Sequence, residues 1–219
     1  MSYKALIFDI DGTLADTFPV CVKAYQRTLE RHVGRHFPPE EIIGWFGKSD
    51  EGILGVYLSP QQLPAVLEEY FQSYEALQRS ECPEPFPGLK ETIRRLHARG
   101  VPVGVVTGKG LRGSEITLHI LGLRPYIDVL EAGFEEGPNK PESLRRALRH
   151  LDLQVHEAVY VGDAAYDMEA AASIGMPAVG AAWTETSSIR NGAGATALQV
   201  FHHIDDFHRW VEQEFSINS

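Results

Sequence analysis

Short apolar runs that alternate with helical patterns constrain this chain most. The runs cover residues 3–8, 101–106, 158–161 and 177–181. Runs that are apolar on both faces are typical of strands buried inside a parallel sheet. Between them, apolar residues recur at helical spacing, and a glycine follows several of the predicted helix ends. This alternation predicts an α/β fold, with a parallel sheet, right-handed crossovers and helices on both faces.

Residues 17–82 interrupt this alternation. They carry apolar side chains at helical spacing, first over residues 18–29 and again over residues 63–77, without a strand pattern between them. The Pro-Glu-Pro-Phe-Pro segment at 83–87 cannot continue a helix and returns the chain to the sheet. We therefore expect a small all-helical domain over 17–82, inserted after the first strand into a core of residues 1–16 and 83–219.

Charge and cysteine content exclude several classes of protein. The chain has 20 Lys and Arg against 30 Asp and Glu, a formal net charge of −10, and no basic run, so binding to nucleic acid or to an anionic membrane is not expected. A bound divalent cation would still allow an anionic substrate. Cys21 and Cys82 stand in no metal-ligand spacing. No apolar stretch reaches membrane-spanning length, so we expect a cytoplasmic protein.

Polar side chains follow three of the apolar runs, where ligands bind to open α/β sheets. Asp9 and Asp11 leave the first strand together before a glycine turn, so one carboxylate can attack while the other handles protons. Asp163 and Asp167 form a second pair after a later strand. Carboxylate oxygens suit magnesium. Alone, an Asp-x-Asp pair is also typical of a turn, and Asp163 of a helix N-cap.

Two further segments add candidate phosphate-binding groups. Thr107, with the backbone N–H groups that follow it at Gly108, can hold phosphate oxygens, and Lys140 before a predicted helix can neutralise their charge. The segment Trp45-Phe46-Gly47-Lys48 is a glycine-containing bend with aromatic side chains and a cation. Trp45, Phe46 and Lys48 are therefore candidate specificity residues; the alternative is a turn between helices with a solvated lysine.

Taken together, these motifs resemble the four signature motifs of the haloacid dehalogenase superfamily. They are Asp-x-Asp-Gly-Thr at 9–13, Thr107, Lys140 and Gly-Asp-x-x-x-Asp at 162–167, and the likeness extends to the segments 86–89 and 191–195. The chain is most similar to the phosphoglycolate phosphatase and β-phosphoglucomutase branch. That resemblance implies a Rossmann-like core with a helical cap at residues 17–82. Ser143 departs from the family, which often has a proline there, and this leaves the start of the helix after Lys140 open.

The resemblance also implies a reaction. Asp9 would attack phosphorus and form an aspartyl-phosphate, while Asp11 would protonate the leaving oxygen and then activate water. Thr107 would orient a phosphoryl oxygen, and Lys140 would offset the negative charge.

Magnesium would be the cofactor implied by the same resemblance. Asp9, the backbone carbonyl of Asp11 and Asp163 would hold Mg²⁺, with Asp167 bound directly or through water. The expected partner is a small phosphorylated metabolite. A sugar phosphomutase, a pyrophosphatase and a nucleotidase remain open as alternatives, and both a monomer and a homodimer are compatible with the sequence. A non-catalytic binding module is disfavoured because all the motif residues are intact.

Overall fold

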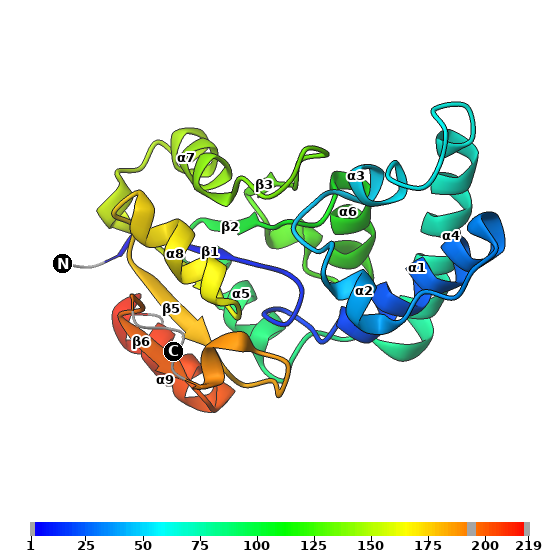
Figure 1. Ribbon diagram of the computed structural model, residues 1–219. Helices are drawn as coiled ribbons and strands as arrows, with labels where there is room; N and C mark the ends of the chain where they lie inside the picture. Colours follow the sequence, from blue (N-terminus) through cyan, green and yellow to red (C-terminus); the bar gives the residue numbers. More distant parts are fainter. Residues whose placement is uncertain (1–2, 192–195, 217–219) are drawn as a thin grey trace.

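A parallel six-stranded sheet forms the centre of the described part of the chain (Figure 1). The computed structural model describes residues 3–191 and 196–216. The strand order is β3-β2-β1-β4-β5-β6, which confirms the predicted α/β class. The strands are β1 (Ala5–Phe8), β2 (Val103–Val106), β3 (Val129–Glu131), β4 (Ala158–Gly162), β5 (Ala178–Ala181) and β6 (Gln199–Phe201).

Strand β1 lies in the middle of the sheet because it pairs with both β2 and β4. Its side chains alternate between two hydrophobic clusters, as a strand buried on both faces requires. Leu6 and Phe8 pack with helices α5 (Leu89–Ala98) and α9 (Ile204–Glu214). Ala5 and Ile7 pack on the other face with α7 (Lys140–His150) and α8 (Ala165–Ser173). Helices therefore cover both faces of the sheet, as predicted.

Four helices between β1 and α5 form a lobe beside the sheet (Figure 1). Their apolar residues make a hydrophobic cluster of their own, which includes the fully buried rings of Tyr70 and Tyr74. The described residues of the segment 17–82 contain no strand, in agreement with the helical pattern. These helices are α1 (Phe18–Val33), α2 (Pro39–Ile43), α3 (Asp50–Leu54) and α4 (Leu63–Glu81); we call them the cap helices.

Helix α6 (Leu111–Ile120) follows β2 and joins the sheet to the cap helices. The hydroxyl oxygens of Tyr74 in α4 and Thr117 in α6 lie 2.7 Å apart, and Thr117 Oγ1 lies 3.1 Å from Gln78 Oε1. All three side chains are buried. Their hydrogen bonds are therefore shielded from water, which makes it costly to leave any of them unpaired. The α4–α6 contact fixes the cap helices over the carboxyl ends of the strands.

The sequence analysis did not predict two of the strands. β3 and β6, three residues each, lie at the two edges of the sheet. The segment 192–195, part of the family resemblance, lies outside the described residues. The remaining short helices are η1 (Arg124–Tyr126), η2 (Val155–Glu157) and η3 (Ser188–Asn191).

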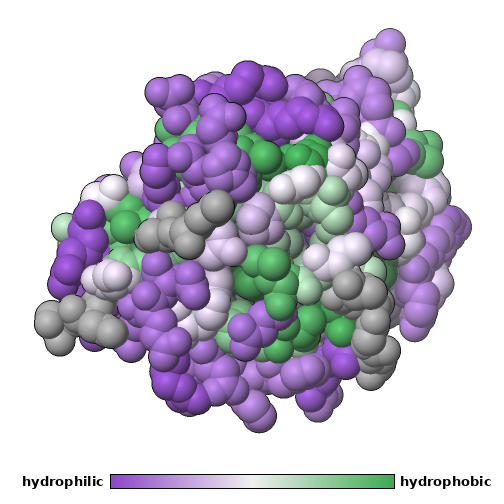
Figure 2. All heavy atoms as spheres, turned by 90° about the vertical axis from the view of Figure 1, so that its left-hand side faces the viewer, coloured by the Kyte–Doolittle hydropathy of each residue, from purple (hydrophilic) through white to green (hydrophobic). Residues whose placement is uncertain are grey.

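The side of the molecule opposite the cap helices carries mainly hydrophilic side chains, with hydrophobic patches between them (Figure 2). Among the described residues, no helix combines the length and apolarity needed to cross a membrane.

Candidate active site

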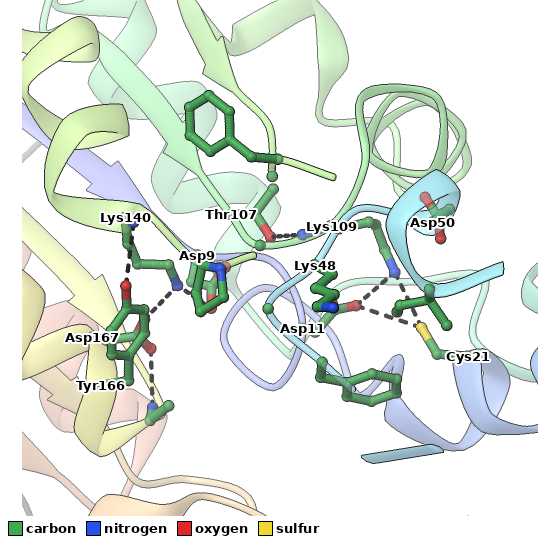
Figure 3. Close-up of a pocket in the computed structure, with 18 of the residues that line it drawn as sticks. Asp9, Asp11, Cys21, Lys48, Asp50, Thr107, Lys109, Lys140, Tyr166 and Asp167 are labelled. Atoms are coloured by element: carbon green, nitrogen blue, oxygen red, sulfur yellow. Dashed lines mark hydrogen bonds and ion pairs between the residues drawn. The ribbon is translucent and has the colours of Figure 1, made fainter. Parts of the chain in front are cut away.

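A pocket of about 320 Å³ lies between the carboxyl ends of β1, β2 and β4 and the cap helices (Figure 3). It brings together nearly every residue that the sequence singled out. These lining residues are Asp9, Asp11, Phe46, Lys48, Thr107, Gly108, Lys140, Asp163 and Asp167.

Three buried carboxylates form a cluster at one side of this pocket. Asp9 follows β1, Asp163 follows β4, and Asp167 lies in the first turn of α8. Each offers an oxygen, and these oxygens all lie within 4.8 Å of one another. Lys140, the first residue of α7, places Nζ 3.1 Å from Asp9 Oδ2 and also donates to Asp167 Oδ1. Helix α7 therefore begins at Lys140 even though Ser143 replaces the family's proline.

Burial and the repulsion between neighbouring carboxylates raise the pKa values of two aspartates in this cluster. Burial, reinforced by Asp167 and Asp9, raises the pKa of Asp163 to about 9. Burial also raises the pKa of Asp9 to about 6, although Lys140 opposes the rise. For Lys140 itself burial lowers the pKa, but Asp167 and Asp9 outweigh it and hold the pKa well above its usual range. One ammonium group thus faces three carboxyl groups, and a bound cation would relieve the repulsion that remains.

The cluster fits a hard divalent cation. Its donors are all carboxylate oxygens, the ligands that magnesium prefers. Asp9 Oδ1 is buried and has no hydrogen-bond partner among the described residues. Gly12 leaves room for Asp163, since a Cβ atom at Gly12 would lie 2.4 Å from Asp163 Oδ2. Gly12 also has a φ of +76°, a backbone conformation that favours glycine.

Asp11 turns away from the cluster and is held at the opposite side of the pocket (Figure 3). Its Oδ1 accepts a hydrogen bond from Thr17 Oγ1, at the start of α1. The same oxygen lies 3.1 Å from Lys109 Nζ and 3.8 Å from Cys21 Sγ. The two carboxylates of the Asp-x-Asp motif therefore have different surroundings, as two different chemical roles require.

Thr107 and Gly108 form the floor of the pocket at the end of β2. The Thr107 side chain is buried, and its Oγ1 accepts a hydrogen bond from the Lys109 backbone N–H at 3.2 Å. Gly108 packs closely against Gly47, because a Cβ atom on Gly108 would lie 3.0 Å from Gly47 Cα. The bend before Lys48 thus lies directly over the predicted phosphate-binding turn.

The three candidate specificity residues have different positions. Phe46 lines the pocket and stacks on Phe18, with ring centroids 5.7 Å apart. Lys48 extends into the pocket (Figure 3), and no ion pair or hydrogen bond involves its ammonium group within the described residues. The expectation for Trp45 needs correction: its ring packs on Phe37 and Tyr57 inside the cap helices rather than against the pocket.

Sequence reasoning missed several pocket residues. Lys109 stands two residues after Thr107, and that short spacing is the one signal that pointed to it. Cys21 and Asp50 reach the pocket only because the cap helices fold over the sheet. Asp50 accepts hydrogen bonds from Tyr25 at 2.7 Å and Tyr70 at 2.9 Å. No spacing along the chain predicts such pairings.

Comparison with known proteins agrees with this arrangement. The family model described as haloacid dehalogenase-like hydrolase matches residues 6–181. A phosphoglycolate phosphatase of Yersinia pseudotuberculosis is 30% identical over 186 residues, covering 81% of this chain and 80% of that protein. A pyrophosphatase PpaX of Bacillus cereus is 26% identical over 186 residues, covering 84% of this chain and 85% of that protein.

A solved structure shares the fold. CbbY from Rhodobacter sphaeroides, in complex with xylulose-(1,5)-bisphosphate, superimposes with a TM-score of 0.74 at 23% identity, over 92% of this chain and 94% of that one. The residues that the family model matches, 6–181, include the buried carboxylates and Lys140. The chain therefore belongs to the haloacid dehalogenase-like hydrolase family, as an enzyme of the phosphatase kind.

Proposed function

We propose that this enzyme is a Mg²⁺-dependent phosphatase that transfers the phosphoryl group of a small phosphate monoester to Asp9. The main support is the buried cluster of Asp9, Asp163 and Asp167 around Lys140, which opens into the same pocket as Asp11. Residues suited to act as nucleophile, proton carrier and cation ligands thereby border one cavity.

In the first step a carboxylate oxygen of Asp9 attacks phosphorus, and the bond between phosphorus and the ester oxygen breaks. Asp11 gives its proton to the leaving oxygen. Thr107 and the backbone N–H groups after it hold phosphoryl oxygens, and the Lys140 ammonium group offsets their charge.

In the second step water attacks the phosphorus atom of the aspartyl-phosphate. Asp11, now a carboxylate, takes a proton from that water. The bond between phosphorus and the Asp9 oxygen breaks, so inorganic phosphate leaves and the carboxylate of Asp9 is restored. Asp11 is protonated again and ready for the next ester.

Magnesium would be held by Asp9, Asp163 and the backbone carbonyl of Asp11, and it would supply positive charge that lets a phosphate dianion approach carboxylates. Asp167 already accepts from Lys140 through Oδ1 and from the Ala164 N–H through Oδ2, at 3.0 Å for the latter. These contacts favour a water-mediated role for Asp167 over a direct bond to the ion.

The cap helices, in this proposal, cover the pocket and select the leaving group. Helices α1, α2 and α3 contribute the apolar walls Phe18, Ile43 and Ile53. The bend between α2 and α3 contributes Phe46 and Lys48, whose ammonium group has no partner within the described residues. Such walls suit an organic body more than the second phosphate group of pyrophosphate. The Lys48 ammonium group suits one acidic group on that body, as in phosphoglycolate. We therefore place an acidic organic phosphate first and pyrophosphate second.

A panel of substrates tests this function. Phosphoglycolate, a sugar phosphate, a nucleoside monophosphate and pyrophosphate are each incubated with the enzyme and Mg²⁺, and released phosphate is measured. We expect the fastest release from an organic monoester. Conversion of one sugar phosphate into another with little free phosphate would instead identify a phosphomutase, and no turnover of any compound would contradict the proposal.

Lys48→Ala tests the selection of the leaving group. Loss of a charge-assisted hydrogen bond should cost ~1.5–3 kcal/mol in kcat/KM for phosphoglycolate, about 10-fold to 150-fold, with little effect on an uncharged ester. Lys90→Ala, which removes an exposed lysine from α5, serves as control. Equal effects of Lys48→Ala on both esters would show that Lys48 does not read the acidic group.

A further inference from the structure

Lys109 belongs to the core by its place in the chain, but its ammonium group is buried among cap residues. Its Nζ lies 3.1 Å from Cys21 Sγ in α1 and 4.8 Å from the centre of the Tyr74 ring in α4. The third neighbour is Asp11 Oδ1, at 3.1 Å. Only 8% of Lys109 is exposed. An ammonium group has three N–H donors, and two of its neighbours here, Asp11 Oδ1 and Cys21 Sγ, lie at hydrogen-bonding distance.

This arrangement separates Lys109 from Lys48, the other lysine on the cap side of the pocket. The Lys48 ammonium group has no partner within the described part of the chain and is free to meet a substrate. The Lys109 ammonium group, by contrast, already has a carboxylate, a thiol and an aromatic ring around it. Its charge is directed at a protein carboxylate instead, in surroundings where that attraction is little screened by water.

The effect on Asp11 is to distinguish its two oxygens. Oδ1 accepts from Thr17 and lies against Lys109. Oδ2 has no hydrogen bond to any of the described residues. A carboxylate fixed through one oxygen keeps the other in a defined place, which is what a group that must give and take a proton at a substrate needs.

We propose that Lys109 is a positioning residue for Asp11: it holds Oδ1 so that Oδ2 carries the proton. The proposal rests on the role of Asp11 under the proposed function. It predicts that removing the Lys109 ammonium group impairs proton transfer more than it impairs the attack of Asp9, because Asp9 lies in the other cluster and does not contact Lys109.

The test measures how strongly the rate depends on the leaving group of the ester. A merely structural role of Lys109 would not change that dependence. A nitrophenolate ion departs without a proton, whereas an alkoxide needs one. We therefore compare Lys109→Met with wild type on p-nitrophenyl phosphate and on an alkyl phosphate that wild type hydrolyses. Methionine keeps most of the unbranched stem and removes the charge. Asp11→Asn provides the benchmark for lost proton transfer, and Lys90→Met provides the same substitution at an exposed lysine of α5, outside the pocket.

The expected result has two parts. Relative to wild type, Lys109→Met should lose about 10-fold to 100-fold more of its turnover of the alkyl ester than of its first release of nitrophenolate. That difference is a part of the ~10²–10⁴-fold rate increase that a positioned proton carrier contributes. With p-nitrophenyl phosphate, a burst of about one nitrophenolate per enzyme should precede slow turnover, because Asp11 must also activate water. Asp11→Asn should show the same pattern more strongly, and Lys90→Met should behave like wild type and show no burst.

Other outcomes separate the hypotheses. Equal losses on both esters without a burst would overturn the role of Lys109. If Asp11→Asn itself shows no leaving-group dependence, the proposed role of Asp11 fails and the inference fails with it. Circular dichroism and thermal unfolding verify that each variant folds. Should Lys109→Met not fold, Lys109→Gln, which keeps a polar group but no charge, is measured in the same way and judged by the same two criteria.

Discussion

Gly12→Ala should damage both stability and metal binding, because two separate costs meet at this position. The φ of +76° imposes ~1–2 kcal/mol on any residue with a Cβ atom. That atom would also lie 2.4 Å from Asp163 Oδ2 and 2.8 Å from Phe18 Cε2, and overpacking of this kind costs about 1–3 kcal/mol. We expect the free energy of unfolding to fall by about 2–5 kcal/mol in total.

Gly34→Ala is the matched control. Gly34 has a φ of +77°, but a Cβ atom there would meet nothing within 4 Å. The free energy of unfolding of Gly34→Ala should fall only by the backbone cost of ~1–2 kcal/mol. The difference between the two variants therefore isolates the collision with Asp163 and Phe18.

Urea unfolding and thermal unfolding measure the two variants, with about 2–4 °C of Tm expected for each kcal/mol in a chain of this size. Because Gly12→Ala displaces Asp163, it should also reduce the rise in Tm that Mg²⁺ produces, while Gly34→Ala should keep that rise. If Gly12→Ala loses no more stability than Gly34→Ala and responds to Mg²⁺ like wild type, the argument from the Gly12 contact is wrong.

Two further predictions concern the carboxylate cluster. Asp9→Asn should keep the fold and lower kcat by about 10³-fold or more, since an amide is a very poor nucleophile; a tenth of wild-type phosphate release would contradict the covalent step. The pKa values of Asp9 and Asp163, raised from 3.8 to about 6 and about 9, mean that the metal-free fold binds protons more tightly than the unfolded chain. The stability that these two carboxyl groups contribute is therefore complete below their unfolded pKa and is lost as pH rises towards 9. Because the carboxyl groups have then lost their protons, Mg²⁺ should raise Tm more at pH 9 than at pH 6. Equal rises in Tm at the two pH values would refute this.

The central strands could be predicted from sequence because burial leaves a plain signal there. β1 and β4 lie inside the sheet and are apolar at every position up to Phe8 and Val161. The edge strands β3 and β6 are only three residues long, and β6 begins with the exposed Gln199. A strand this short has too few buried residues for its sequence to show a pattern of apolar positions. The sequence therefore predicts the central strands of the sheet but not the strands at its two edges.

The same distinction applies to the site. Asp9 and Asp163 were predictable because parallel strands end at one edge of a sheet, so residues that follow them meet without any knowledge of packing. Lys109 depends on where Cys21 and Tyr74 come to lie, and these positions follow from the packing of α1 and α4 over the sheet. Trp45 was misplaced for the same reason: nothing in its local sequence indicates which side of the bend faces Tyr57.

The central position of β1 also has a consequence for biosynthesis. Residues 5–8 leave the ribosome long before their partners in β2 and β4, which begin at Val103 and Ala158. At about 5–20 residues per second, roughly 5–20 s pass before β1 meets β2. Helices α1 to α4, whose hydrophobic cluster is almost complete within residues 18–81, can form during that interval. The nascent chain must therefore carry an unpaired apolar strand while the inserted helices assemble, and a strand in that state is open to aggregation until Val103–Val106 arrives.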